Sequence, residues 1–225
     1  MTAALLFDLD GTLVDTDAEH LVAFQRVFAP HGILLDRAEY VASIMGASNE
    51  MIGRKFLPHL PHDLREQTLA AKEQAYRDGL GDLEPIAGIA ALLDWADGHG
   101  LARAVVTNAP RANADLVLAA IGLAERLPIR VIGGELARSK PDPLPYLTGL
   151  RQTGARAENS VAFEDSLSGV RAAAAAGLAV VGITTSLDAV RLIEVGAVFA
   201  VADFTDARIT ALIETRRAVG EQAPL

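Results

Sequence analysis

Short apolar runs alternate with helical patterns along most of the chain, and this alternation constrains the fold more than any other feature. An apolar run of four to seven residues that ends at a turn signal is typical of a buried strand. Strands that alternate with helices form βαβ units, so the order predicts an α/β fold, a parallel sheet with helices on both faces. The expected strands are residues 3–7, 101–107, 129–132, 160–163, 178–183 and 197–201, and the expected helices between them are 111–121, 144–153, 166–176 and 186–194.

The interval from residue 16 to residue 84 breaks this alternation and contains no convincing strand. Thr16 and Glu19 have the spacing of a capping box, which predicts the start of a helix at residue 17. We therefore expect a small all-helical domain, residues 16–84, inserted after the first strand of a core made of residues 1–15 and 85–225. Its expected helices are residues 17–28, 37–44, 49–57 and 63–78.

The amino-acid composition limits which binding partners and which cellular compartment we expect for this protein. The 225-residue chain has a formal net charge of −9 and no cysteine. The negative charge argues against nucleic acid or an anionic membrane as a partner, and the lack of cysteine excludes disulfides and thiolate chemistry. The longest uncharged stretch, residues 172–187, is too short and too glycine-broken for a membrane span, and the early Asp8 does not fit a signal peptide. We expect a cytoplasmic protein, and the sequence leaves its oligomeric state open.

Asp8 and Asp10 follow the first predicted strand, where the chain turns at Gly11. Open α/β sheets bind ligands beyond the carboxyl ends of their strands. One carboxylate at such a position can attack a phosphorus atom while the next works as acid and base. The alternative for the pair alone is an ordinary polar turn, because Asp and Gly are common turn residues.

Three further segments carry complementary groups near expected strand ends. Thr107 and Asn108 offer donors just before a helix, which suits a phosphate oxygen. Lys140 lies in a proline-stiffened loop, where its ammonium can neutralise a transferring phosphoryl group. Glu164 and Asp165 end another strand, directly before an expected helix cap. Converging carboxylates need a cation among them, and oxygen ligands without Cys or His favour Mg²⁺.

In chain order, these segments resemble the four motifs of the haloacid dehalogenase-like hydrolase superfamily. The motifs are FDLDGT at residues 7–12, Thr107-Asn108, Lys140-Pro141 and EDSLSG at residues 164–169. The run over residues 164–177 resembles the branch that contains β-phosphoglucomutase and phosphoglycolate phosphatase. The resemblance spans essentially the whole chain, and it implies a Rossmann-like core with a helical cap inserted between the first two motifs.

The resemblance also implies roles for individual residues. Asp8 would be the nucleophile that forms an aspartyl-phosphate, and Asp10 would protonate the leaving oxygen and later take a proton from water. Thr107 and the backbone of Asn108 would hold phosphoryl oxygens, with Lys140 pairing with Asp8 and the phosphate. These groups suit phosphoryl transfer, which asks mainly for in-line positioning and charge neutralisation.

The implied metal is Mg²⁺, held by Asp8, Asp165, the carbonyl of Asp10 and Glu164. Glu164 has an alternative, in which it supports Asp165 without touching the ion. Dehalogenases of this superfamily lack the second acid of the first motif and need no metal, so the presence of Asp10 argues against dehalogenation.

The cap loop departs from the mutase pattern. Where β-phosphoglucomutases carry an arginine after Gly-x-Ser, this chain has Asn49, so one phosphate anchor is missing. A mutase must hold a bisphosphate in two orientations, so the departure favours a phosphatase, although His20 matches mutase-like members. Other candidate substrate contacts are Arg54, Lys55, Lys72 and Arg77, for which a solvated helix face is the structural alternative.

The favoured interpretation is a Mg²⁺-dependent phosphatase acting on a small phosphorylated metabolite, a sugar phosphate or a short acid phosphate. The alternatives are a sugar phosphate mutase and a catalytically idle binding protein. His59 and His62 lie among prolines and are expected to be loop residues rather than metal ligands. Asn113, in the helix after the second motif, is expected to be structural.

Overall fold

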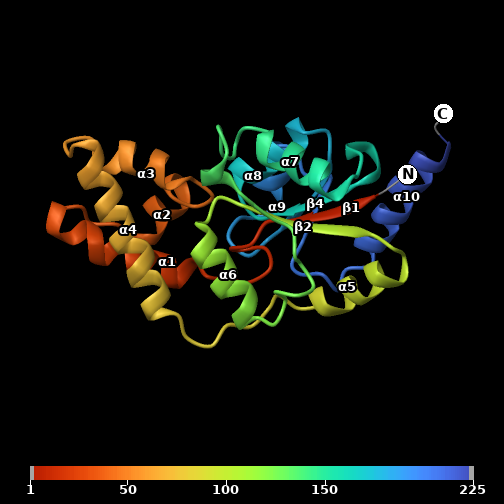
Figure 1. Cartoon of the computed structure of the whole chain (residues 1–225), viewed down its shortest axis with the longest axis horizontal. Coiled ribbons are helices and arrows are strands. Elements are labelled where there is room, and N and C mark those ends of the chain that lie inside the picture. Colours follow the sequence, from red (N-terminus) through yellow and green to blue (C-terminus); the bar gives the residue numbers. More distant parts are fainter. Residues whose placement is uncertain (1–2, 223–225) are drawn as a thin grey trace.

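A six-stranded parallel sheet forms the centre of the computed structural model, which describes residues 3–222 (Figure 1). The strand order is β3-β2-β1-β4-β5-β6, and all neighbouring strands run parallel. The first strand of the chain is therefore central, with β2 on one side and β4 on the other. The strands are β1 (Ala4–Phe7), β2 (Ala102–Thr107), β3 (Arg130–Ile132), β4 (Val161–Glu164), β5 (Ala179–Ile183) and β6 (Phe199–Val201).

The central strand is apolar on both sides because both faces of the sheet are covered. Leu5 and Phe7 face one hydrophobic core, while Ala4 and Leu6 face the other. Phe7 stacks on Phe163 of β4, with ring centroids 4.9 Å apart. Side chains that alternate along a buried strand thus tie β1 to both layers of helices.

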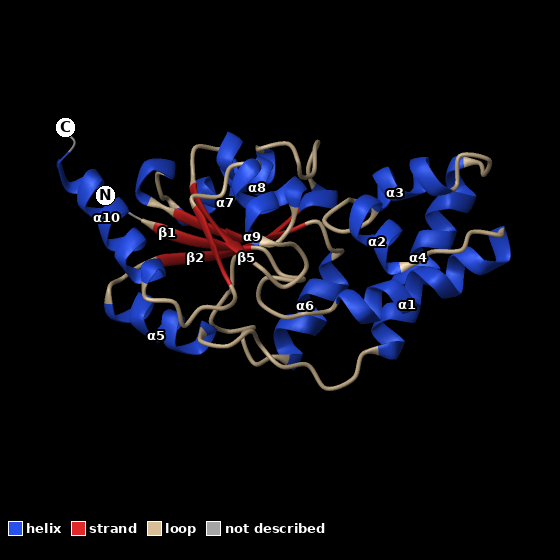
Figure 2. Cartoon of the chain, turned by 180° about the vertical axis from the view of Figure 1, so that it is seen from behind, coloured by secondary structure: helices blue, strands red, loops and turns tan. Residues whose placement is uncertain are grey.

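In the described part of the chain, three helices pack on each face of the sheet (Figure 2). The core that contains Phe7 is closed by α5 (Ile89–Gly98), α6 (Arg111–Ala120) and α10 (Arg208–Gln222). The core that contains Leu6 is closed by α7 (Leu144–Thr153), α8 (Leu167–Ala175) and α9 (Ala189–Glu194). Short 3-10 turns, η1 (Ala29–His31), η2 (Gly133–Glu135) and η3 (Ala157–Asn159), complete the described elements.

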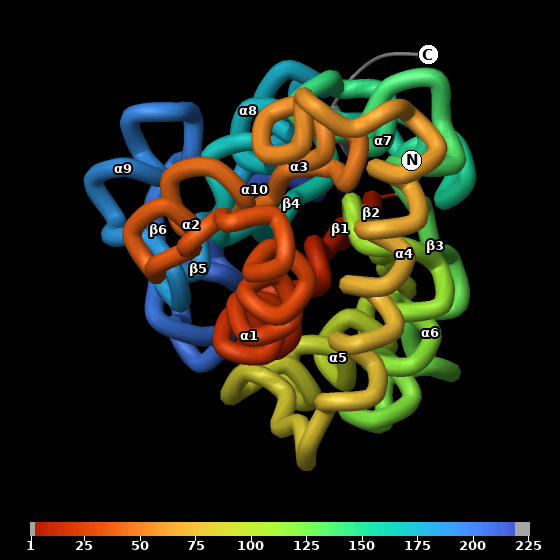
Figure 3. The backbone as a smooth tube through the Cα atoms, turned by 90° about the vertical axis from the view of Figure 1, so that its left-hand side faces the viewer, coloured from red at the N-terminus to blue at the C-terminus, as the bar shows by residue number. Residues whose placement is uncertain are grey.

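Within residues 3–222, four helices gather at the end of the molecule toward which the strands point (Figures 1 and 3). They have a hydrophobic cluster of their own, built around Phe24, Phe28 and Leu69. The two chain segments that lead into and out of this group run side by side, since Val14 pairs with Pro85 and the Ile86 amide donates to the Leu13 carbonyl at 2.8 Å. The four helices are α1 (Asp17–Phe28), α2 (Arg37–Ser43), α3 (Asn49–Phe56) and α4 (His62–Gly79).

The parallel sheet with helices on both faces confirms the predicted fold class. Every predicted strand and helix is present, with ends shifted by up to three residues, whereas α5 and α10 were not assigned in the sequence analysis. Helix α1 begins at Asp17 as predicted, but the predicted capping box is not formed. The Thr16 hydroxyl makes no cap bond and donates instead to Asp10 Oδ1 at 2.7 Å. Among residues 3–222, no helix combines the length and apolarity needed to cross a membrane.

Candidate active site

The polar residues of the site come from the carboxyl ends of three neighbouring strands. Asp8 directly follows β1, Thr107 ends β2 and Glu164 ends β4. Because β1 lies between the other two strands, their ends meet at one edge of the sheet, the position where open α/β sheets bind ligands. The turn after Asp8 needs Gly11, which has a φ of +78° and where an added Cβ would lie 2.1 Å from Asp165 Oδ2.

Lys140 is buried at this edge of the sheet, between the carboxylates of Asp8 and Glu164. Its Nζ donates to Asp8 Oδ1 and to Glu164 Oε1, each at 2.6 Å, and the residue is only 2 % exposed. Tyr146 of α7 donates its hydroxyl to the same Oε1 of Glu164 at 2.6 Å, and Ser166 donates to Oε2 at 3.2 Å. Both oxygens of Glu164 are therefore hydrogen-bonded, and the ammonium is fixed against Asp8.

Asp8, Glu164 and Asp165 form a compact buried cluster of carboxylates. Each offers one oxygen within 4.8 Å of the others, and all three residues are buried. Burial raises the pKa of Asp8 to about 8 although Lys140 opposes the shift, and burial with the charges of Asp8 and Glu164 raises the pKa of Asp165 well above its usual value. Buried carboxylates at this spacing are costly unless a cation joins them. An all-oxygen donor set of this kind fits Mg²⁺.

Asp10 lies in a different environment from Asp8. Its Oδ1 accepts a hydrogen bond from Thr16 at 2.7 Å, and His20 Nε2 and the Tyr76 hydroxyl each lie 3.5 Å from the same oxygen. Burial alone would raise the pKa of Asp10, but His20 and Thr16, aided by the charge of Lys72, hold it below its usual value. The pKa of Asp8 is therefore raised, whereas the pKa of Asp10 is lowered.

Thr107 and Asn108 line the site but are partly engaged with the protein. The Thr107 hydroxyl accepts from the Ala109 amide at 2.9 Å. Asn108 Nδ2 donates to the carbonyls of Gly46 at 3.0 Å and Lys140 at 3.2 Å, and its Oδ1 accepts from the Lys140 amide. The Asn108 side chain therefore ties the Lys140 loop to the loop between α2 and α3.

Lys72 of α4 does not lie on a solvated helix face, because it is only 3 % exposed. The solvated-face alternative for this residue is therefore wrong. Its Nζ lies 2.9 Å from His20 Nδ1 and 3.1 Å from Glu73 Oε2, and it sits 4.3 Å from the centroid of the Phe24 ring. Burial lowers the pKa of Lys72, while Glu73 opposes that shift. The α1–α4 group thus brings a buried cation and a histidine toward Asp10.

Glu73 joins the helical group to the sheet domain. Its Oε1 accepts from Asn49 Nδ2 at 2.7 Å, and its Oε2 accepts from Asn113 Nδ2 of α6 at 2.6 Å. The Oδ1 of Asn113 in turn accepts from Arg77 Nη1 at 2.8 Å. Asn113 is buried and structural, in agreement with the prediction, and Arg77 is half-buried rather than on a solvated face.

A small cavity of about 80 Å³ lies between the strand ends and the helical group. The α1–α4 helices contribute to its lining, so both parts of the fold enclose it. Glu164 does not line the cavity, but it accepts a hydrogen bond from Lys140, which does. The predicted site residues that line it are Asp8, Asp10, His20, Asn49, Lys72, Thr107, Asn108, Lys140 and Asp165.

Comparison with known proteins agrees with this geometry. The family model of the haloacid dehalogenase-like hydrolases matches residues 5–183, which include all four motifs. The chain belongs to the haloacid dehalogenase-like hydrolase family.

Its relatives in this family include named phosphatases. It is 35% identical over 189 residues to protein CbbY of Rhodobacter capsulatus, covering 79% of this chain and 83% of that protein. It is 31% identical over 184 residues to the fructose-1-phosphate phosphatase YqaB of Escherichia coli, covering 80% of this chain and 96% of that protein. The crystal structure of CbbY from Rhodobacter sphaeroides in complex with phosphate is 30% identical, with a TM-score of 0.80 over 92% of this chain and 96% of that chain.

Several residues of the site carry no recognisable signal in the sequence of this haloacid dehalogenase-like hydrolase. Asp17 accepts from the Tyr40 hydroxyl at 3.0 Å and from Ser186 at 2.7 Å, which joins α1 to α2 and to the loop after β5. Tyr146 and Glu73, described above, are further examples. Each of these side chains acts through a hydrogen bond to a residue far away in the sequence. A local sequence pattern does not reveal such contacts.

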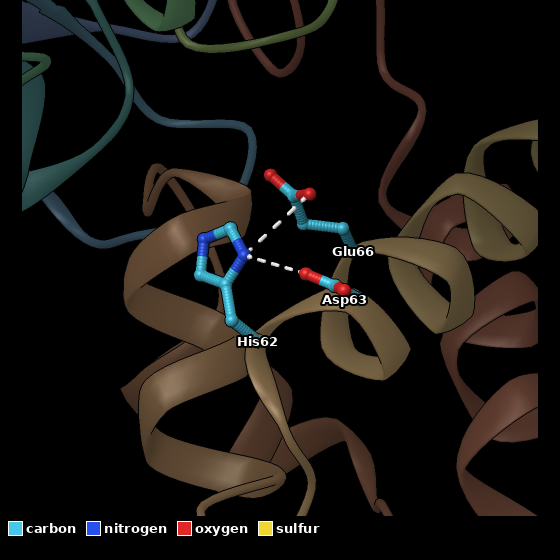
Figure 4. Close-up of side chains that lie close together, drawn as sticks. All are labelled: His62, Asp63 and Glu66. Carbon is cyan, nitrogen blue, oxygen red and sulfur yellow. Dashed lines mark ion pairs between the residues drawn. The ribbon is translucent and has the colours of Figure 1, made fainter.

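An exposed cluster on α4 is separate from these groups. His62 is the first residue of α4 rather than a loop residue, which corrects the prediction, whereas His59 does lie in a loop. His62 Nδ1 lies 3.5 Å from Asp63 Oδ1 and 3.6 Å from Glu66 Oε2 (Figure 4). All three side chains are exposed, and surface ion pairs at a helix start account for them.

Proposed function

We propose that this protein is a Mg²⁺-dependent phosphatase that hydrolyses a small phosphorylated metabolite through an aspartyl-phosphate on Asp8. One observation carries the proposal: two carboxylates that are two residues apart line one cavity in opposite electrostatic environments. Asp8 lies against Lys140, while Asp10 lies apart with Thr16 and His20. A cation bound beside Asp8 would lower the raised pKa of Asp8 and leave its carboxylate ionised for attack, and Asp10, which lies apart from Lys140, would transfer the protons.

In the first step, a carboxylate oxygen of Asp8 attacks the phosphorus atom, and the bond from phosphorus to the ester oxygen breaks. Asp10 in its protonated form gives its proton to that leaving oxygen. In the second step, Asp10 takes a proton from a water molecule that attacks the aspartyl-phosphate, which releases phosphate and restores Asp8. Lys140 neutralises the negative charge beside Asp8 in both steps.

The carboxylates of Asp8 and Asp165 and the carbonyl of Asp10 would hold Mg²⁺. When bound, the ion would neutralise charge on the phosphoryl oxygens. Glu164 already accepts hydrogen bonds on both oxygens, so its main contribution in this proposal is to hold Lys140 against Asp8. Thr107 and the backbone at Asn108 would orient the phosphoryl group next to the start of α6.

The helices within residues 16–84 would act as a cap that supplies His20 and Lys72 to the leaving group. Asn49, in the position of the mutase arginine, is hydrogen-bonded to Glu73, which supports hydrolysis over intramolecular transfer. The names of the relatives point to sugar phosphates as the substrate class, since one acts on fructose 1-phosphate.

Phosphate release from a panel of sugar phosphates and short acid phosphates tests the proposal, with Mg²⁺ and with EDTA. We expect metal-dependent release, and we expect Asp8→Asn to fold normally yet lose at least about a thousandfold in turnover, because covalent catalysis would vanish. The matched control is Asp82→Asn, an exposed residue.

Wild-type rates in a well-folded Asp8→Asn would contradict the proposal. Transfer of label from a sugar 1-phosphate to its 6-phosphate without net release would identify the mutase instead. Absence of both turnover and Mg²⁺ binding by calorimetry would favour the idle binding protein.

A further inference from the structure

Glu73 of α4 presents a buried carboxylate to the catalytic cavity. The residue lines the cavity, yet it is only 5 % exposed. Burial would raise the pKa of Glu73, but the charge of Lys72 and a hydrogen bond from Asn49 hold it below its usual value. The carboxylate is therefore ionised near neutral pH, although neither step of the proposed hydrolysis uses it.

The donor groups around Glu73 are turned toward its carboxylate. Asn49 Nδ2 donates to Oε1 at 2.7 Å, and Asn113 Nδ2 donates to Oε2 at 2.6 Å. Lys72 Nζ lies 3.2 Å and 3.1 Å from the same two oxygens. Donors of this kind hold anions through charge-assisted hydrogen bonds, and here a carboxylate of the protein itself already occupies them.

The charge of Lys72 is compensated within the protein before any ligand enters. Besides the Glu73 carboxylate, its Nζ contacts His20 Nδ1 at 2.9 Å and lies 4.3 Å from the centroid of the Phe24 ring. The ammonium therefore has a carboxylate, an imidazole and an aromatic face as its neighbours. A buried ion pair with such partners leaves little positive charge to attract a second anion.

Few positive charges line the cavity. Among residues 3–222, its cationic side chains are Lys72 and Lys140, with the imidazole of His20, and no arginine lines it. His20 Nε2 lies 3.5 Å from the Asp10 carboxylate. Lys140 lies against Asp8, where the phosphoryl group would bind. Within the described chain, the α1–α4 side of the cavity thus offers a leaving group no positive charge that lacks a partner.

Asp17 of α1 adds another carboxylate from the helical group. It lines the cavity and is 5 % exposed, and the hydroxyls of Tyr40 and Ser186 that donate to it are neutral. Arg37 Nη2 lies 4.0 Å from Asp17 Oδ2, but its side chain is 60 % exposed, so water screens its charge. A negatively charged leaving group would be desolvated beside Asp17 and Glu73, which is costly without a cationic partner.

We propose that Glu73 is a specificity-determining residue, which excludes leaving groups that carry a negative charge. The preferred substrates are monophosphate esters of uncharged alcohols, and esters whose alcohol bears a carboxylate or other anionic group are rejected. This inference rests on the proposed phosphatase function and narrows its substrate class. Glu73 acts through its charge and through the donors that it occupies, and it takes no part in the covalent steps.

Two esters with the same carbon skeleton test the inference. The leaving alcohol of 2-hydroxyethyl phosphate is neutral, whereas that of 2-phosphoglycolate carries a carboxylate. We expect the wild-type protein to prefer the neutral ester by at least about tenfold in kcat/KM, and Glu73→Gln to narrow this preference about tenfold, because the charge of Lys72 is then uncompensated. Glu50→Gln is the matched control and should keep the wild-type preference, since Glu50 is exposed, pairs with Arg54 and does not line the cavity.

A binding measurement separates this inference from the catalytic proposal. In 3-hydroxypropylphosphonate and 3-phosphonopropionate a methylene group replaces the ester oxygen of the two esters, so neither compound is hydrolysed. Calorimetry with Mg²⁺ should show that the wild-type protein binds the alcohol at least about tenfold more tightly, and that Glu73→Gln narrows the difference. This result supports the role of Glu73 even if no ester is hydrolysed, in which case only the phosphatase proposal fails.

Equal or tighter binding of the carboxylate by the wild-type protein would overturn the inference, and this comparison does not depend on whether Glu73→Gln folds. An unchanged preference in a folded Glu73→Gln variant would overturn it as well, because the discrimination would then have another source.

Discussion

Tyr146 illustrates how a residue outside the motifs supports the site. Its hydroxyl is buried and donates to Glu164 Oε1, the same atom that accepts from Lys140. The Lys140 ammonium also lies 5.1 Å from the centroid of the Tyr146 ring. Tyr146 thus stabilises both members of the buried ion pair, and burial raises the pKa of its own hydroxyl well above the usual value.

Tyr146→Phe should lower the free energy of unfolding by about 2 kcal/mol, the range for a buried hydrogen bond to a charged group. Urea unfolding with an unchanged m-value measures this loss. Tyr76→Phe is the comparison, because its hydroxyl lies 3.5 Å from Asp10, a length at which a hydrogen bond is weak. Equal losses in the two variants would contradict the importance assigned to the Glu164 contact.

At the scale of elements, α4 meets α6 through one buried amide. Asn113 donates to Glu73 and accepts from Arg77, residues four apart on the same side of α4. The two ends of an amide match a carboxylate and a guanidinium on successive helical turns. This contact fixes how the helical group sits on the sheet domain.

Asn113→Ala should lower the free energy of unfolding by about 1–3 kcal/mol, since it leaves the Glu73 carboxylate and the Arg77 guanidinium each short of a partner. It should also speed hydrogen exchange in peptides covering residues 62–79, because the docking of α4 weakens. Asp115→Ala, on the same helix, removes a half-exposed ion pair with Arg130 and should cost about 1 kcal/mol or less. Unchanged exchange in α4 would show that Asn113 does not dock the helical group.

At the scale of the whole molecule, the buried carboxylates make stability depend on pH and metal. The pKa of Asp8 rises from 3.8 to about 8, and that of Asp165 also rises. Between about pH 4 and pH 8, the folded metal-free protein therefore keeps protons that the unfolded chain has released, so its free energy of unfolding falls as pH rises. The lowered pKa of Asp10 acts in the opposite sense, and its contribution is lost only below that range.

We expect the melting temperature of the metal-free protein to fall from pH 5 to pH 8, and Mg²⁺ to raise it most at pH 8, because a cation stabilises the ionised carboxylates. Asp8→Asn removes one of the titrating groups, so its melting temperature should fall less steeply over the same range. A metal-free wild type that becomes more stable toward pH 8 would contradict the raised pKa values.

The sequence by itself determined the order of strands and helices, the parallel sheet, and the position of Asp8 at a strand end. These features follow from local patterns: the four residues of β1 are buried on both sides, which makes them continuously apolar. Ser166 also caps α8 as expected, through a bond to the Gly169 amide. Interactions between residues that are close in the sequence can be predicted from local sequence patterns of this kind.

Only the tertiary structure decided what the polar side chains do. Thr16 carries a helix-start signal, but its hydroxyl binds Asp10 because the chain folds back on itself at that point. Lys72 has the sequence neighbours of a surface lysine, yet α1 covers it with His20 and Phe24. Burial and long-range partners set the free energy of a charged group, and both arise only when distant segments pack together.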